Sequence, residues 1–186
     1  EAELGPVTLQ VWDSPSRIDE ILHLYSDTET RGWKGAAGTA VGFDDAQGQF
    51  YRDLLEAAAR QGCLRMFVLM IGERPAAQQI VIQCDGIIYF LKTTYDESLA
   101  AYAPGVIQRY LILRWSHAQQ PPVRDFEIYG QVKEAIAPFI TSTRSMYHLT
   151  VFRYGILRSP LEALRWLRRR AASFGWGAPG RASTPW

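Results

Sequence analysis

The chain has 186 residues, 47% of them hydrophobic and 21% charged, and a formal net charge of +1. This length suits one domain with a sizeable core, and the composition excludes a disordered or fibrous chain. The near-neutral charge gives no case for binding nucleic acid. No apolar run approaches the roughly 18 residues that a membrane span needs, and no signal peptide is visible, so we expect a cytoplasmic protein.

The two cysteines and three histidines are too scattered to form a recognisable site. Cys63 and Cys84 each lie at or beside an apolar run, which predicts buried free thiols rather than a disulfide or metal ligands. His23, His117 and His148 lie far apart, and none has a serine or cysteine signature beside it. The sequence therefore predicts neither a nucleophile triad nor a metal site.

The first part of the chain is predicted to form a strand, a helix and a polar loop. The strand covers Val7–Trp12, and the helix covers Ser16–Thr28, capped by Ser14 with Pro15 in its first turn. The segment Glu29–Gly42 is rich in glycine and alanine, which breaks the helical pattern. It is either a solvated connector or a flexible loop that bends over a ligand.

A second helix and an antiparallel meander are predicted next. Asp44 or Asp45 can cap this helix and Gly62 ends it. Its buried face is expected to contain Phe50, Tyr51, Leu54, Leu55 and Ala58. The meander consists of the strands Leu64–Ile71, Ala76–Cys84 and Ile87–Thr93, and the dipeptide Asp85-Gly86 between the last two is the strongest hairpin signal in the sequence.

The stretch Phe90–Trp115 combines a strand, an acidic loop, a break at Pro104-Gly105 and an apolar helix. This helix is predicted over Val106–His117, with an inward face formed by Val106, Ile107, Tyr110, Leu111 and Leu113. The glycine leaves the helix start uncluttered, and a helix start presents free N–H groups and the positive end of its dipole. The break therefore predicts a site for an anion such as a phosphate.

The remainder is predicted to contain two strands, Arg124–Tyr129 and Met146–Arg153, which complete a domain over residues 1–155. Residues 156–174 carry five arginines against one glutamate, and this basic helix is a candidate for contact with an anionic membrane surface or a carrier protein. The alternative is a solvated helix that docks its leucines on the domain. Residues 175–186 are expected to be a flexible tail.

Several stretches, together with the order of the elements, carry a resemblance to a known family. They are Glu29–Gly35 (ETRGWKG) with Gly38-Thr39, Phe50-Tyr51 with Gly62, and Leu91–Glu97 (LKTTYDE) followed by Tyr102–Gly105 (YAPG). A later motif is matched in part by Asp125-Phe126, Gly130 and Lys133. In these features the chain resembles GNAT N-acyltransferases, and among them the FemAB-like branch and the acetyltransferases associated with cellulose and exopolysaccharide biosynthesis.

This resemblance implies a single α/β domain in which helices flank a mixed, mostly antiparallel central sheet. It also implies acetyl-CoA or another acyl-CoA as the acyl donor and an amine as the acceptor. The donor would be held by the backbone of Phe90, Leu91, Lys92 and Thr93, with its pyrophosphate at Gly105, Val106 and Ile107. A carrier-bound acyl group, an aminoacyl-tRNA donor and a non-catalytic binding module in an assembly are the alternatives.

Acyl transfer to an amine needs a deprotonated amine, a polarised thioester and a proton for the leaving thiolate. From the loop position and the resemblance, we expect Glu29 to accept the amine proton. Tyr95 or Tyr129 would protonate the thiolate or orient the thioester. The predicted acceptor-binding residues are Trp33 as a pocket wall, Lys34 as a partner of Glu29 or of an acidic acceptor, and Asp125, for which a structural role is an equal alternative.

Overall fold

This computed structural model describes residues 4–38, 40, 42, 44–130, 132, 134, 136–147, 149 and 160. The chain divides into two compact units, residues 1–136 and 137–186. The first unit contains the sheet and every described helix except one short 3-10 helix, η3 (Ala137–Phe139). The site residues considered below all belong to the first unit.

Five strands form one sheet, and their order across the sheet is their order along the chain. The first four are antiparallel to their neighbours, whereas the fifth runs parallel to the fourth. Their bounds are β1 Val7–Trp12, β2 Leu64–Ile71, β3 Arg74–Cys84, β4 Ile87–Tyr95 and β5 Asp125–Ile128. The β3–β4 turn is made by Asp85 and Gly86, both with positive φ (50° and 75°), as tight hairpins require.

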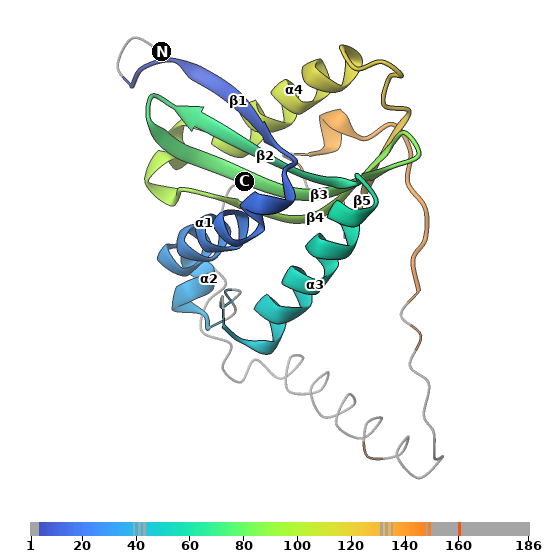
Figure 1. Cartoon of the computed structure of the whole chain (residues 1–186). Coiled ribbons are helices and arrows are strands. Elements are labelled where there is room, and N and C mark those ends of the chain that lie inside the picture. Colours follow the sequence, from blue (N-terminus) through green and yellow to red (C-terminus); the bar gives the residue numbers. More distant parts are fainter. Residues whose placement is uncertain are drawn as a thin grey trace. The chain divides into compact units, whose positions relative to one another are not determined.

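Helices cover both faces of this sheet. The helices α1 (Ile18–Arg31), α2 (Trp33–Ala36) and α3 (Ala46–Arg60) lie on one face, and α4 (Pro104–His117) lies on the other (Figure 1). Two 3-10 helices lead into longer helices: η1 (Pro15–Arg17) into α1 and η2 (Glu97–Tyr102) into α4. The expected mixed, mostly antiparallel sheet flanked by helices is confirmed.

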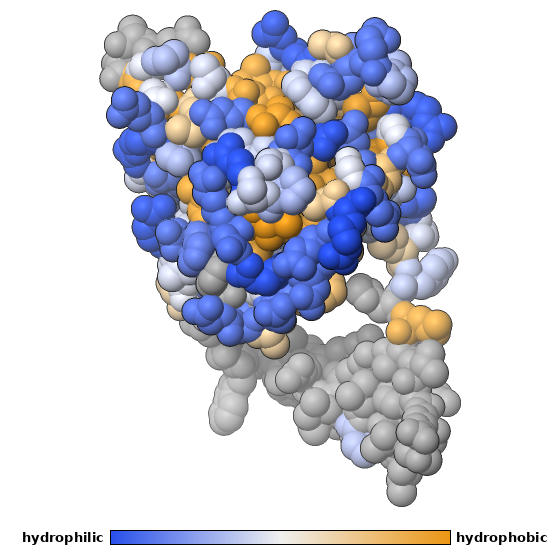
Figure 2. All heavy atoms as spheres, in the orientation of Figure 1, coloured by the Kyte–Doolittle hydropathy of each residue, from blue (hydrophilic) through white to orange (hydrophobic). Residues whose placement is uncertain are grey.

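Each face of the sheet has its own apolar core. The core under α1 and α3 includes Ile21, Leu22, Tyr25, Leu55, Met66, Val68 and Ile80. The core under α4 includes Phe67, Val81, Ile88, Phe90 and Ile112. Because consecutive strand residues point to opposite faces, β2 contributes to both cores and is apolar almost throughout. The viewed outer surface, by contrast, is mostly hydrophilic with a few apolar patches between (Figure 2).

The fourth strand continues beyond its parallel neighbour. β5 pairs with β4 only from Ile87 to Phe90, and in the described chain no strand lies beside Leu91–Tyr95 on that side. The register with β3 also shifts here, because Ile80 pairs with Lys92 while Val81 pairs with Phe90, which leaves Leu91 as an extra residue in a β-bulge. β4 and β5 therefore part at Phe90.

Two predicted helix faces are wrong in part, although Ile107 and Leu111 of α4 and Tyr51 of α3 do pack against the cores. In α4 the buried residues are Pro104, Gln108, Ile112 and Ser116, whereas Val106 and Tyr110 are exposed (38% and 54%). Apolar side chains occur all around this helix, so its pattern does not mark one inner face. In α3 the buried face contains Leu55 and Ala58 as expected, but Phe50 is 57% exposed.

Cys63 and Cys84 form a disulfide with their Cα atoms 5.4 Å apart, so the prediction of free thiols is wrong. Cys63 directly precedes β2 and Cys84 ends β3. Pairing of Leu64 with Ile82 brings the far ends of this hairpin together, although the two cysteines are separated by 21 positions in the sequence.

Several boundaries also differ from the sequence-based expectations. The helix α1 continues to Arg31, so the first residues of the predicted loop are helical. The Ser14 hydroxyl contacts the Ser16 hydroxyl and does not cap the helix that follows. Asp45 caps α3 by accepting from the Gly48 N–H (2.7 Å).

In the predicted strand Met146–Arg153, the described residues Met146, Tyr147 and Leu149 are exposed and not in a strand. Its remaining residues, the basic helix apart from Pro160, and the tail lie outside the described residues.

Candidate active site

A buried carboxylate, Glu29, occupies the last turn of α1 and is only 2% exposed. Its Oε1 accepts a hydrogen bond from the Tyr25 hydroxyl (2.8 Å) and forms an ion pair with Lys34. Tyr25 and Glu29 are neighbours on one helix face because they are four residues apart. The predicted pairing of Lys34 with Glu29 is confirmed.

The position of Lys34 depends on the tight connection between α1 and α2. Gly35 passes so close to the end of α1 that a Cβ there would lie 1.8 Å from the Thr30 carbonyl oxygen. Only glycine permits this approach without displacing the backbone. The short helix α2 can therefore fold back and carry Lys34 against Glu29.

The same residues contact β4 beyond the point where β5 ends. The Thr93 carbonyl accepts hydrogen bonds from the Tyr25 hydroxyl (3.1 Å) and from Lys34 Nζ (3.4 Å). Thr93 lies three residues past Phe90, the last residue of β4 that pairs with β5. Tyr25 and Lys34 thus link the buried carboxylate to the part of β4 that no described strand covers.

A second lysine joins this group from β4. Lys92 Nζ lies 5.4 Å from the ring centroid of Tyr51 on α3. Burial lowers the pKa of Lys92, as does the nearby charge of Lys34, whereas Glu29 raises it. Burial and then the charge of Glu29 raise the pKa of the Tyr51 phenol. We refer to Tyr25, Glu29, Lys34, Tyr51 and Lys92 as the Glu29 cluster.

The start of α4 has an open approach. The N–H groups of Val106 and Ile107 both donate to the Ala103 carbonyl (3.0 and 3.2 Å), and Pro104 has no N–H. Among the described residues nothing accepts a hydrogen bond from the Gly105 N–H, and a Cβ at Gly105 would meet nothing within 4 Å. Of the three residues predicted to hold a pyrophosphate, Gly105 alone offers an uncommitted N–H.

Of the two predicted tyrosines, Tyr95 lies on the opposite face of the sheet from Glu29, where it packs with Ile107 and Leu111 on the α4 side. Tyr129 follows β5 and is 49% exposed. Burial and then the nearby Glu97 raise the pKa of Tyr95.

The other predicted residues occupy varied positions. Asp125 is exposed at the start of β5, and Trp33 begins α2 with a side chain outside the described part. Phe90 stacks on Phe126 of β5, with centroids 6.0 Å apart. Leu91 packs against the core under α1. Thr39 and Lys133 of the quoted motifs lie outside the described residues.

Two residues of the cluster, Tyr25 and Tyr51, are absent from the predicted site. Both were assigned to apolar helix faces, and both do pack there. A signal was nevertheless present, because Tyr25 lies four residues before Glu29 in one helix and so must share its face. Tyr51 comes from another helix, and the Phe50-Tyr51 pair of the family resemblance marks this residue without placing it beside Glu29.

The described residues form neither a metal-binding group nor a membrane-spanning helix. No group of three or more histidine, cysteine or acidic side chains could hold a metal ion. No described helix is long and apolar enough to cross a membrane. The hollow between the start of α1 and α3 is lined by Pro15, Asp19, Arg52 and their neighbours and contains no residue of the Glu29 cluster.

Known proteins identify the class to which this fold and site belong. The sequence model of the acetyltransferase (GNAT) domain family matches residues 1–134. The chain belongs to this family, which makes acyl transfer its general class of reaction. No curated protein matches the chain, and the narrower likeness to the FemAB-like branch stays a prediction.

One solved structure supports this fold, and two others resemble the chain less closely. A possible acetyltransferase from Clostridium difficile 630 is similar with a TM-score of 0.54 at 12% identity, over 79% of this chain and 99% of that one. A GCN5-related N-acetyltransferase from Ralstonia eutropha JMP134 gives 0.47 at 16% identity, over 78% and 99%. An aminoglycoside acetyltransferase from an uncultured soil metagenomic sample, in complex with sisomicin, gives 0.49 at 7% identity, over 80% and 97%. At such identities the first of these supports the fold alone.

Proposed function

We propose that this domain transfers an acetyl or longer acyl group from acyl-CoA to an amine acceptor. The observation that carries the proposal is the parting of β4 and β5 at Phe90. Past that point no described strand lies along the outer edge of β4, which is flanked by the Glu29 cluster on one face and the open start of α4 on the other. A donor and an acceptor could thus approach the same strand segment from opposite faces.

The residues present fit an acyl-CoA on the α4 side. Beyond Phe90, β4 still pairs with β3 on one edge, but its other edge has no partner strand within the described chain, so amide groups of a ligand could pair with that edge. Gly105 contributes a free N–H at the positive end of the helix dipole, next to open space. When bound, an acyl-CoA supplies an acyl thioester.

On the other face, the Glu29 cluster fits an amine acceptor. The amine nitrogen attacks the thioester carbonyl carbon, so that a C–N bond forms and the C–S bond breaks. Glu29 takes the proton that the amine loses, directly or through water. Lys34 and Lys92 hold positive charge beside the site and favour an acceptor that carries an acidic group elsewhere.

The leaving thiolate must also receive a proton. Tyr95 and Tyr129 remain the sequence-based candidates, and we add Tyr51, whose raised pKa keeps its phenol protonated and able to donate. Tyr51 has the further advantage that it shares a face of the sheet with Glu29. A Tyr51→Phe variant with unchanged turnover would remove Tyr51 from this role.

Donor binding provides the test. Thermal unfolding and calorimetry with acetyl-CoA, longer acyl-CoAs and an acyl-carrier protein should show which thioester stabilises the domain. We expect stabilisation by an acyl-CoA, with a Kd that can be compared across chain lengths. Failure of every thioester to stabilise the domain would contradict the proposal and favour a non-catalytic module, whereas a response to the carrier protein alone would identify a different donor.

A further inference from the structure

Lysine is rare in this chain, yet two lysines lie together in the Glu29 cluster. Of the 20 basic residues only Lys34, Lys92 and Lys133 are lysines, and the rest are arginines. Both side-chain types supply positive charge, but only the lysine amine readily loses its proton when buried and can then act as a nucleophile. The cluster therefore contains amines where arginine would have supplied charge alone.

The two amines of the cluster differ in their contacts. Lys34 Nζ forms an ion pair with Glu29 and donates to the Thr93 carbonyl, so the carboxylate favours its protonated form. Lys92 is partly buried, and within the described residues its amine forms no hydrogen bond or ion pair. It faces the Tyr51 ring at 5.4 Å. Because burial lowers the pKa of Lys92, this amine has the larger neutral fraction of the two.

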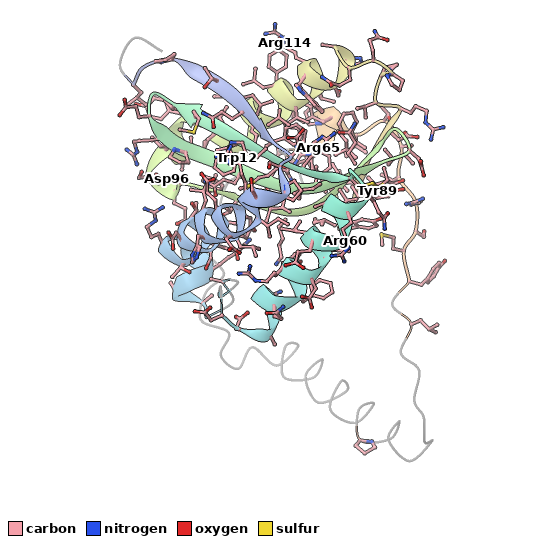
Figure 3. All side chains as sticks on the ribbon, in the orientation of Figure 1. Trp12, Arg60, Arg65, Tyr89, Asp96 and Arg114 are labelled. Carbon is pink, nitrogen blue, oxygen red and sulfur yellow. A yellow bond between two sulfur atoms is a disulfide. The ribbon has the colours of Figure 1, made fainter. Side chains whose placement is uncertain are left out.

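Lys92 also lies on the segment where we propose that the acyl donor binds. It is the second residue past Phe90 on β4, where no described strand lies along the outer edge. This segment lies between the labelled Tyr89 and Asp96 (Figure 3). Lys92 pairs with Ile80, which belongs to the core under α1, so its side chain is on the face of the Glu29 cluster. The chain thus holds an amine of its own on the face assigned to the acceptor.

We propose that Lys92 is itself an acyl acceptor, so that the domain acylates its own chain at this residue. The inference rests on the proposed function, because the acyl group comes from the same acyl-CoA. The neutral Nζ attacks the thioester carbonyl carbon, a C–N bond forms and the C–S bond breaks. The nitrogen gives its proton to Glu29, and the CoA thiolate takes a proton from Tyr51 or from water. The product is a stable amide, so the modification stays on the chain.

Acylation of Lys92 changes the charge on the acceptor side of the site. The proposed preference for acidic acceptors depends on the positive charges of Lys34 and Lys92. An amide at Lys92 removes one of these charges and the attraction between the ammonium and the Tyr51 ring. A domain supplied with donor but not with acceptor therefore reduces its own preference for acidic acceptors.

Incubation of the protein with acetyl-CoA alone, without any acceptor, tests the proposal. Intact mass and peptide mass spectrometry measure how much acetyl group each lysine gains with time. In the folded protein we expect Lys92 to be acetylated at least ~10-fold faster than Lys34 or Lys133, because Glu29 assists the transfer. In urea-unfolded protein the three lysines should react at one common slow rate, which measures the uncatalysed background.

Three variants separate the amine, the base and the background. Lys92→Arg keeps the charge but removes the nucleophile, so the fast acetylation should disappear. Glu29→Gln should slow acetylation of Lys92 at least ~10-fold, because loss of the proton acceptor outweighs the larger neutral fraction of the amine. The matched control Glu20→Gln, an exposed carboxylate on the same helix, should leave the rate within about twofold.

A reagent that needs no catalysis measures the reactivity of the amine by itself. Limiting N-hydroxysuccinimidyl acetate near neutral pH should label Lys92 before Lys34 in the wild-type protein. Glu29→Gln should increase this labelling of Lys92, since the charge of Glu29 raises the pKa of that amine. The same variant is thus expected to have opposite effects with the activated ester and with acetyl-CoA, which a general loss of folding would not produce.

The proposal is overturned if folded protein gains acetyl groups on Lys92 from acetyl-CoA no faster than the unfolded chain does. Earlier labelling of Lys34 than of Lys92, by either reagent, also contradicts it. Calorimetry with acetyl-CoA keeps this result apart from the proposed function. Binding of acetyl-CoA without acetylation of Lys92 rejects self-acylation alone, whereas the absence of binding rejects the acyl-CoA donor as well.

Discussion

Burial and hydrogen bonding of Glu29 determine what this residue can do. The carboxylate is almost fully enclosed, and such a charge is tolerated because Lys34 and Tyr25 both contact its Oε1. These contacts also hold it beside the Thr93 carbonyl, at the uncovered edge of β4. Removing the charge should therefore affect both reaction and stability, to different degrees.

We predict that Glu29→Gln lowers kcat/KM for an amine acceptor at least ~100-fold, in line with the loss of a general base. The free energy of unfolding should fall by only about 2 kcal/mol, because the partly exposed Lys34 can reach water once its partner is gone. Glu20→Gln, an exposed carboxylate on the same helix, is the control. Full turnover by Glu29→Gln would exclude the proposed role.

An NMR titration of the Lys92 side chain should show how the charges around it change its pKa. Its pKa is lowered by burial and by Lys34 and raised by Glu29, so Glu29→Gln should lower it further and Lys34→Met should raise it. Because the folded-state pKa lies below the unfolded value, the unfolded chain binds more protons between the two. At pH values between these two pKa values, the contribution of Lys92 therefore makes the free energy of unfolding increase as pH rises. A pKa of Lys92 that increases in Glu29→Gln would place this lysine outside the cluster.

At the level of single residues, the sequence predicts part of the site. Glu29 and Lys34 were recognisable because both lie in one short polar segment. Tyr95 was expected beside them, but residues of β4 alternate between faces, and the bulge at Leu91 shifts that alternation. A bulge leaves no reliable mark in a sequence, so the face of each residue beyond it could not be assigned.

Among the elements, α4 is attached to the sheet by a buried amide. Gln108 Nε2 donates to the carbonyls of Phe67 on β2 and Ala77 on β3, both at 3.0 Å. We predict that Gln108→Leu lowers the free energy of unfolding by about 2 kcal/mol, because two buried carbonyls lose their donor. Urea denaturation measures this, and Arg114→Ala on the exposed face of α4 should change it by less than about 0.5 kcal/mol. An equal effect of both variants would contradict the attachment.

The start of α4 allows a second element-level test. Gly105→Val should fold with unchanged or slightly higher stability, because a Cβ there meets no protein atom within 4 Å and glycine is a poor helix residue. Its affinity for acetyl-CoA should nevertheless fall at least ~10-fold, since the added side chain occupies the open approach. Ala118→Val, at the far end of the helix, is the control. Unchanged affinity in Gly105→Val would move the donor away from this helix start.

The elements themselves were largely predictable, but their inner faces were less so. The meander and its Asp85-Gly86 turn follow from alternating apolar runs and turn chemistry. The inner face of α4 was misassigned because Val106 and Tyr110 are apolar yet exposed, while polar Gln108 is buried. Burial of Gln108 depends on two carbonyls from strands about 30 or more residues away, which the local pattern cannot reveal.

At the scale of the whole molecule, the disulfide closes the β2–β3 hairpin. In the chain-entropy account, a loop with a separation of 21 residues gains about 3 kcal/mol from such a cross-link. We therefore predict that dithiothreitol lowers the unfolding free energy by about this amount. The untreated protein should not react with iodoacetamide under denaturing conditions, as intact mass would show. Labelling of both cysteines without reductant would restore the expectation of free thiols.

This disulfide could not be inferred from the sequence because it depends on strand register. Cys63 and Cys84 come close enough to bond only when β2 and β3 pair as Leu64 with Ile82, and the shift near Leu69 alters that register by one residue. Two cysteines beside apolar runs are equally consistent with buried thiols. Location in the cytoplasm stays a prediction.

The strands follow one another across the sheet in the same order as along the chain, and this affects the order in which they fold. Strands β2, β3 and β4 pair with their nearest neighbours in the sequence, and such hairpins form within about 1–10 µs. β5 adds only after α4 has crossed the sheet, and its parallel pairing is short. We expect pulsed hydrogen exchange to show amides of β2–β4 protected before those of β5. The part of the molecule that we propose binds the acyl donor would then be the last to acquire its shape.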